Sequence, residues 1–105
     1  MAYTNLYPDS FNAISDSAGI SDFDLEKIEE QIRNIKKSKT ADIVIVSFHW
    51  GEEYQTRSNL KQQTISRALI DAGADLIVGH HPHVVQEIEK YGSLGLPAGG
   101  WVAYS

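Results

Sequence analysis

The chain has 105 residues, of which 42% are hydrophobic and 22% charged, and these values are typical of one small globular domain (residues 1–105). The formal net charge is -5, which argues against a nucleic acid or an anionic membrane as partner. There is no cysteine, which excludes disulfides and thiolate metal sites. We find no apolar run of the roughly 18 residues that a membrane helix needs, and no targeting segment at the N-terminus.

The first forty residues predict a loop followed by a helix. Residues 1–20 are rich in Asn, Asp, Ser, Pro and Gly, a composition typical of loops. Ser21 is a good N-cap residue, and Asp24 stands three residues later in a position like that of a capping box. Apolar residues then recur at helical spacing and predict one packed face, formed by Leu25, Ile28, Ile32 and Ile35.

The middle of the chain predicts a strand, a helix and a second strand. Residues 42–48 are almost continuously apolar and β-branched, which favours a strand covered on both faces. Residues 59–72 carry an apolar stripe at helical spacing, and Gly73 is a natural stop for this helix. Residues 75–79 form the second apolar run. This order predicts a βαβ unit with two parallel strands.

The C-terminal segment is interpreted as a β-hairpin. Residues 84–91 mix apolar and polar side chains in a strand-like way, and residues 101–105 resemble a second strand after a stretch that contains Gly and Pro. A short helix over residues 84–90 is the competing prediction. The fold class is therefore α/β, with a parallel βαβ unit followed by a β-hairpin. Both ends of the chain are abrupt, and we expect a piece of a larger domain.

All four histidines follow the two predicted parallel strands. His49 comes after the first strand, whereas His80, His81 and His83 come after the second. Parallel strands end at the same edge of a sheet, and open α/β sheets place their ligands at that edge. We therefore expect the four side chains to converge. Imidazole is the commonest metal ligand and also acts as an acid or base near neutral pH.

Nearby acidic residues could complete a metal site with these histidines: Glu52, Glu53 and Asp75. The alternative is structural, since histidines at strand ends can also bond to backbone carbonyls. A site like that of metallo-β-lactamases is disfavoured, because residues 84–86 (Val-Val-Gln) stand where an Asp-His pair should follow.

Two long motifs resemble a known family. Residues 41–54 read ADIVIVSFHWGEEY, and residues 69–91 read LIDAGADLIVGHHPHVVQEIEKY. Together with the final WVAYS, they resemble the bacterial capsule synthesis protein family of CapA type, which is linked to poly-γ-glutamate capsules. That family is similar to the calcineurin-like metallophosphoesterase superfamily. The resemblance implies part of a four-layer sandwich of two β-sheets flanked by helices, with a two-metal centre at strand ends.

The resemblance also implies roles for individual residues. His49 matches a metal-binding histidine that follows a strand. The GHHPH segment resembles a Gly-His-x-His motif with one additional residue, so that His81 and His83 are implied metal ligands. His80 keeps the Gly-His adjacency and is implied as a further ligand or as the catalytic proton donor. Glu53 belongs to the family pattern and is assigned to substrate binding, with an exposed loop carboxylate as the alternative.

For the longer parent protein, the resemblance implies a hydrolase similar to phosphoesterases that uses a pair of divalent metal ions (manganese, zinc or iron). The early motifs of the superfamily have no counterpart in these 105 residues. We therefore expect the missing N-terminal part of the same domain to be the partner of this chain, which would bind one metal ion or none and be inactive alone. The competing hypothesis is a non-catalytic module of a surface-polymer assembly system with a vestigial metal site.

Two further expectations concern the parent protein and its assembly. The resemblance implies a parent at the cell surface or outside the cell, anchored to the membrane. Exposed strand edges and apolar faces favour self-association. We expect a homo-oligomer that uses the edge at residues 101–105 or the apolar face of the first helix.

Overall fold

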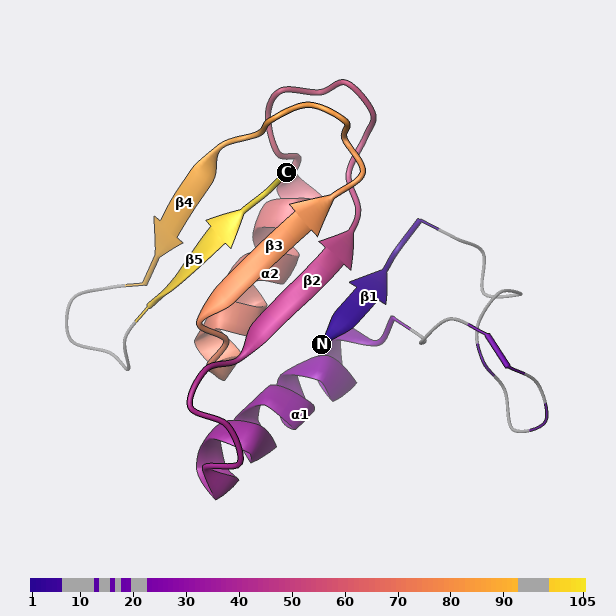
Figure 1. Ribbon diagram of the computed structural model, residues 1–105. Helices are drawn as coiled ribbons and strands as arrows, with labels where there is room; N and C mark the ends of the chain where they lie inside the picture. Colours follow the sequence, from indigo (N-terminus) through magenta and orange to yellow (C-terminus); the bar gives the residue numbers. More distant parts are fainter. Residues whose placement is uncertain (7–12, 14–15, 17, 20–22, 93–98) are drawn as a thin grey trace.

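The computed structural model describes residues 1–6, 13, 16, 18–19, 23–92 and 99–105. The described part of the chain forms one five-stranded sheet with two helices on one of its faces (Figure 1). The strand order is β1-β2-β3-β5-β4. The elements are β1 (Ala2–Thr4), α1 (Leu25–Ser38), β2 (Ile45–His49), α2 (Leu60–Ala72), β3 (Leu76–His80), β4 (Ile88–Tyr91) and β5 (Gly100–Ala103).

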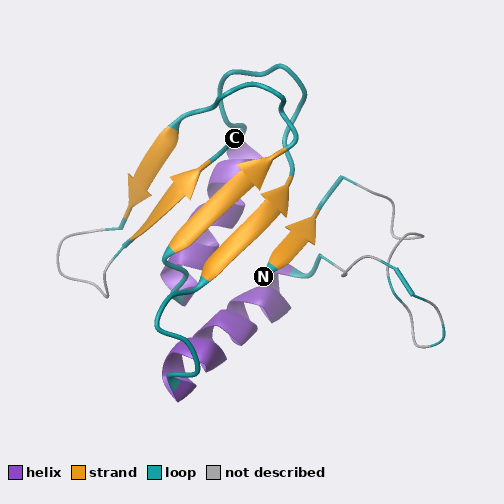
Figure 2. Ribbon diagram, in the orientation of Figure 1, coloured by secondary structure: helices purple, strands orange, loops and turns teal. Residues whose placement is uncertain are grey.

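The predicted βαβ unit and hairpin are both confirmed (Figure 2). Strands β2 and β3 pair in parallel, and their register sets His49 opposite His80 at the carboxyl ends. Strand β3 also pairs in parallel with β5, whereas β4 and β5 are antiparallel. The competing helix over residues 84–90 is wrong, because residues 88–91 form β4.

The core lies between the sheet and the two helices. Alternate strand residues point toward the helices and are fully buried, among them Val46, Phe48 and Ile77. Helix α1 contributes Ile28 and Ile32 to the same core, as its apolar spacing predicted. This face of α1 is therefore packed within the chain and does not serve as a surface for self-association.

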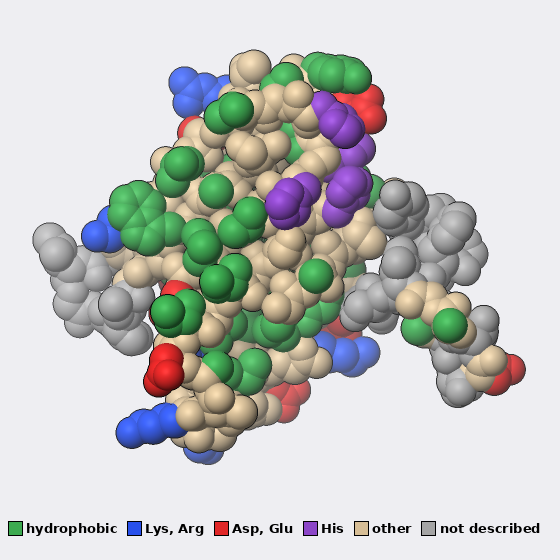
Figure 3. Space-filling model, viewed as in Figure 1, with side chains coloured by type: hydrophobic (Ala, Val, Ile, Leu, Met, Phe, Trp, Pro, Cys, Tyr) green, Lys and Arg blue, Asp and Glu red, His purple; other side chains and the backbone are tan. Residues whose placement is uncertain are grey.

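The opposite face of the sheet is not covered by any element that the structure describes. Ile45 on β2 is 48% exposed and Trp101 on β5 is 49% exposed. Figure 3 shows apolar side chains spread over this face, with the histidines gathered at one end. The expectation that residues 42–48 are covered on both faces is thus not met within the described residues. We call this surface, which includes Ile45, Ser47, Leu76, Val78, His80 and Trp101, the open face.

The N-terminal region departs from the sequence prediction in two places. Residues 2–4 form strand β1 instead of a loop, because their backbone pairs in parallel with β2. Helix α1 has Asp24 as its N-cap, since the Asp24 carboxylate accepts a hydrogen bond from the Lys27 amide. Ser21, the predicted cap, lies outside the described residues.

The strand order also shows that the expected edge at residues 101–105 is wrong. Strand β5 lies between β3 and β4, so residues 101–103 are not at an edge, and the outer strands are β1 and β4. Neither α1 nor α2 is long and apolar enough to cross a membrane.

Candidate metal centre

Two loops at the carboxyl end of the parallel strands form the candidate site. Residues 50–59 follow β2, and residues 81–87 follow β3. Backbone hydrogen bonds connect the loops: the Trp50 amide donates to the His80 carbonyl (3.1 Å), and the Tyr54 amide donates to the Pro82 carbonyl (2.8 Å). The second bond joins the amide that follows Glu53 to the carbonyl of Pro82, the residue between His81 and His83.

Three of the predicted residues come together as a possible ligand set. Glu53, His81 and His83 each offer one ligand atom, and these atoms all lie within 4.8 Å of one another. The Nε2 atom of His83 is 4.0 Å from the Oε1 atom of Glu53. The ring of His49 lies beside this set, with its centroid 4.7 Å from that of His81. The expected convergence therefore holds for His49, His81 and His83.

The backbone of the site adopts conformations that are uncommon for side-chain-bearing residues. His81 (φ 103°), His83 (φ 59°) and Tyr54 (φ 62°) all have positive φ values. Such strain is concentrated at functional sites, where the surrounding structure maintains it. Here the Tyr54 amide donates to the Pro82 carbonyl, so that the three residues belong to two loops that this bond connects. This pattern favours a functional reason for the shape of these loops.

The surroundings of His49 lower the pKa of its imidazole. Partial burial lowers its pKa below the usual value, and the neighbouring His81, His80 and His83 lower the pKa further, because a positive charge on any of them disfavours another. A neutral imidazole is the form that binds metal ions. The lowered pKa of His49 therefore favours the form that can act as a ligand.

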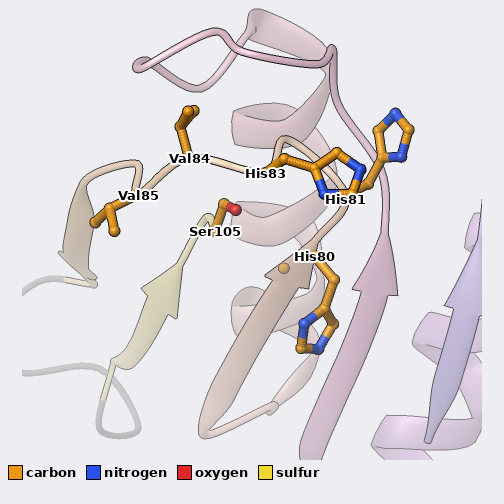
Figure 4. A pocket seen from close by; sticks show the side chains of 7 residues that line it. His80, His81, His83, Val84, Val85 and Ser105 are labelled. Carbon is orange, nitrogen blue, oxygen red and sulfur yellow. The ribbon is translucent and has the colours of Figure 1, made fainter.

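His80 occupies a different position from the other three histidines. Its side chain lies on the open face, where Nε2 is 3.1 Å from the Ser47 Oγ atom. Figure 4 shows the His80 ring pointing away from His81 and His83, toward the sheet. A cavity of about 370 Å³ is nevertheless lined by His80 together with His81 and His83, and its lining also includes Val84, Val85 and Ser105.

The other two carboxylates proposed from the sequence are not part of the ligand set. Asp75 precedes β3 and lies at the opposite end of that strand from the histidines, where its carboxylate bonds to Lys36 Nζ (2.6 Å) and to the Val44 amide (2.7 Å). Its expected role at the metal site is wrong, because strand direction separates the two ends of β3. Glu52 is exposed and does not join the group formed by Glu53.

Sequence reasoning did not identify Gln86 as part of the site. This side chain is only 3% exposed and makes three hydrogen bonds with the loop after β2 and with α2. Gln86 stands three residues after His83 and next to Glu87, in a stretch of mixed polarity, and nothing local distinguishes it. Its partners are distant in the sequence and became apparent only from the structure.

Comparisons with known proteins identify relatives of this chain. The family model described as "Bacterial capsule synthesis protein PGA_cap" matches residues 2–105. The chain is 43% identical over 91 residues to the PGA biosynthesis protein CapA of Bacillus subtilis, and 37% identical over 93 residues to the capsule biosynthesis protein CapA of Bacillus anthracis. Each alignment covers 87% of this chain and 23% of the relative, so the chain spans about a quarter of their length.

A more distant relative is a probable polyglutamine synthesis accessory protein of Mycobacterium tuberculosis, which is 38% identical over 53 residues (50% of this chain and 14% of the relative). Because the family model matches nearly every residue, the chain belongs to the bacterial capsule synthesis protein family.

Proposed function

We propose that the chain provides one side of a divalent-metal site in a protein of capsule biosynthesis, with poly-γ-glutamate as the polymer. The observation that carries this proposal is the close grouping of Glu53, His81 and His83, with His49 beside them. The capsule context is supported by family membership and by the names of the two Bacillus relatives. Glu53, first assigned to substrate binding, acts in this proposal as the carboxylate ligand.

The donor set fits some metal ions better than others. Imidazole nitrogens together with one carboxylate suit zinc, manganese or iron, whereas calcium and magnesium prefer a shell of oxygen atoms. A metal ion bound at such a site polarises a phosphoryl or carbonyl oxygen and lowers the pKa of a bound water. The residues of this chain would hold the ion, and His80, which lies outside the ligand set but lines the same cavity as His81 and His83, would act as the proton donor.

For the longer parent protein, we propose a metal-dependent hydrolase similar to phosphoesterases that is anchored at the cell surface. Further ligands for a second metal ion would come from the part of the parent that these 105 residues do not include. That part is also the partner we propose for the open face, since the relatives are about four times as long as their matched segment. The isolated chain is then expected to bind metal without turnover.

A zinc titration followed by calorimetry tests the metal site. We expect Glu53→Gln, His83→Ala and His49→Ala to weaken zinc binding by at least tenfold. Glu53 and His83 are proposed ligands, and His49 lies beside them. Glu52→Gln is the matched control, since it removes an equal charge from the adjacent exposed position. Binding should also weaken as the pH falls through the histidine range. Wild-type affinity in both histidine variants would refute the proposal.

An activity assay separates the two classes of function. The chain alone and the full-length parent are incubated with a generic phosphodiester and manganese. Turnover by the parent that is lost in its counterpart of His80→Ala supports the hydrolase. A parent that binds metal at this site but has no turnover would support the non-catalytic module instead. Robust turnover by the isolated chain would contradict the need for further ligands.

A further inference from the structure

We propose that Gln86 is a positioning residue that holds the Glu53 loop against the His83 loop and so sets the distance between these two side chains. This inference rests on the proposed metal site, because it concerns the geometry of that site. It assigns a role to a residue that does not itself contact the ligand set.

The first observation is the hydrogen bonding of the Gln86 side chain. Its Nε2 atom donates to the Gln55 carbonyl (2.9 Å) and to the Arg57 carbonyl (3.1 Å). These carbonyls lie two and four residues after Glu53, in a loop without helix or strand. Gln86 itself stands three residues after His83. One buried amide thus connects the two short segments that carry the proposed ligands.

The second observation is that Gln62 of α2 fixes the orientation of the Gln86 amide. Gln86 Oε1 accepts a hydrogen bond from Gln62 Nε2 (3.0 Å), and both side chains are at least 97% buried. Gln62 is in turn fixed by the α2 capping box, in which its Oε1 accepts from the Asn59 amide (2.9 Å). Because Gln62 can offer only its NH₂ group, the Gln86 NH₂ group must face the two loop carbonyls.

A second connection between the loops lies farther from the ligands. Glu87 accepts hydrogen bonds from the amide and the hydroxyl of Ser58, which precedes the cap of α2. These bonds join the ends of the two loops just before the start of α2. Gln86 acts closer to Glu53 and, with the bond from Tyr54 to Pro82, determines how the ligand-bearing parts lie together. Loss of Gln86 should therefore affect the ligands as well as the fold.

The test uses Gln86→Met, which keeps the length of the side chain but removes all three hydrogen bonds. Ile28→Val is the control, because it destabilises the core beneath α1, remote from both loops. We expect both variants to lower the unfolding midpoint, but only Gln86→Met to weaken zinc binding, by about tenfold. Gln86→Asn, which keeps the amide but is one methylene shorter, should show the same loss if Gln86→Met does not fold.

A second measurement does not depend on metal. Hydrogen exchange of the Tyr54 amide in the metal-free chain reports whether the two loops remain joined, since this amide donates to Pro82. We expect faster exchange in the Gln86 variants and unchanged exchange in Ile28→Val. Wild-type zinc affinity together with wild-type exchange would overturn the inference. If the wild type binds no zinc, the metal site fails, and the exchange comparison alone decides the role of Gln86.

Discussion

Gly79, which begins the GHHPH segment, is required for steric reasons. The Trp50 indole donates from Nε1 to the Tyr104 carbonyl (3.0 Å), and this pair passes directly over Gly79. A Cβ atom at Gly79 would lie 2.0 Å from the Tyr104 oxygen and 2.3 Å from Trp50 Nε1. Both distances are far inside van der Waals contact. The glycine of the motif therefore serves packing beneath the site and not metal contact.

Gly79→Ala should destabilise the chain by about 3 kcal/mol, because the backbone oxygen of Tyr104 cannot move away without separating the strands. Urea denaturation followed by tryptophan fluorescence measures this loss. Ser47→Ala, on the neighbouring strand but on the open face, should change the stability by about 0.5 kcal/mol or less. Equal stability of Gly79→Ala and the wild type would show that the contact over Gly79 is absent in solution.

The Asp75 carboxylate gives the stability a pH dependence. Burial raises its pKa, but the hydrogen bonds from Lys36 and the Val44 amide outweigh this effect and hold the pKa below its usual value. A depressed folded-state pKa stabilises the fold above the unfolded value of about 4, and this contribution disappears as the pH falls through the folded-state pKa. The pair with Lys36 is partly exposed, so we expect only about 1 kcal/mol.

Asp75→Asn should accordingly lower the free energy of unfolding at pH 7 and have little effect near pH 2. Denaturant titrations at both pH values measure the difference. Asp42→Asn, which removes an exposed carboxylate near the same helix end, is the control and should leave the stability unchanged. A constant difference between Asp75→Asn and wild type at both pH values would exclude the proposed linkage.

At the level of elements, helix α2 starts with a complete capping box. The Asn59 side chain accepts from the Gln62 amide (2.9 Å), and the Gln62 side chain accepts from the Asn59 amide. Two of the unpaired amides at the helix start are thereby satisfied. Gly73 ends the helix with a φ of 115°, a conformation that glycine adopts without strain.

Asn59→Ala should cost about 1 kcal/mol, the usual effect of losing an N-cap side chain. Thermal unfolding monitored by circular dichroism measures the loss, with Lys61→Ala as an exposed control in the same turn. Because Gln62 also supports Gln86, the variant should in addition speed the exchange of the Tyr54 amide. A stability loss without any change in this exchange would mean that the cap and the loops are independent.

Local patterns in the sequence predicted most of the elements. The apolar periodicity of α1 and α2, the β-branched runs of β2 and β3 and the stop at Gly73 are all short-range signals. Strand β1 was missed because its three residues become a strand only by pairing with β2, which is distant in the chain. The sequence predicted the N-cap at Ser21 instead of Asp24, because two good capping residues lie close together.

The site was predictable only as far as topology determines it. Parallel strands place His49 and the GHHPH segment at one edge, and this required no knowledge of side-chain directions. The grouping of Glu53 with His83, by contrast, depends on loops with positive φ at residues that are not glycine, and no local rule predicts such conformations. His80 is different, because it ends β3, and strand alternation places it on the same face as Leu76 and Val78.

At the level of the whole molecule, the open face determines how the isolated chain behaves. Large exposed apolar surfaces drive association, and Ile45, Ile88 and Trp101 contribute to one here. We expect the isolated chain to self-associate at high concentration in sedimentation experiments. Trp101→Lys should shift it toward monomer, whereas Asn34→Lys, which adds the same charge on α1, should not. A chain that remains monomeric at all concentrations would show that this exposed surface does not drive association.

The position of His80 connects the open face with the candidate site. Its ring lies on the open face against Ser47. Any segment that covers this face must therefore lie near a residue of the proposed catalytic set. Covering the open face would thus also remove water from around the His80 ring, so that the surroundings of this histidine differ between a covered and an uncovered chain.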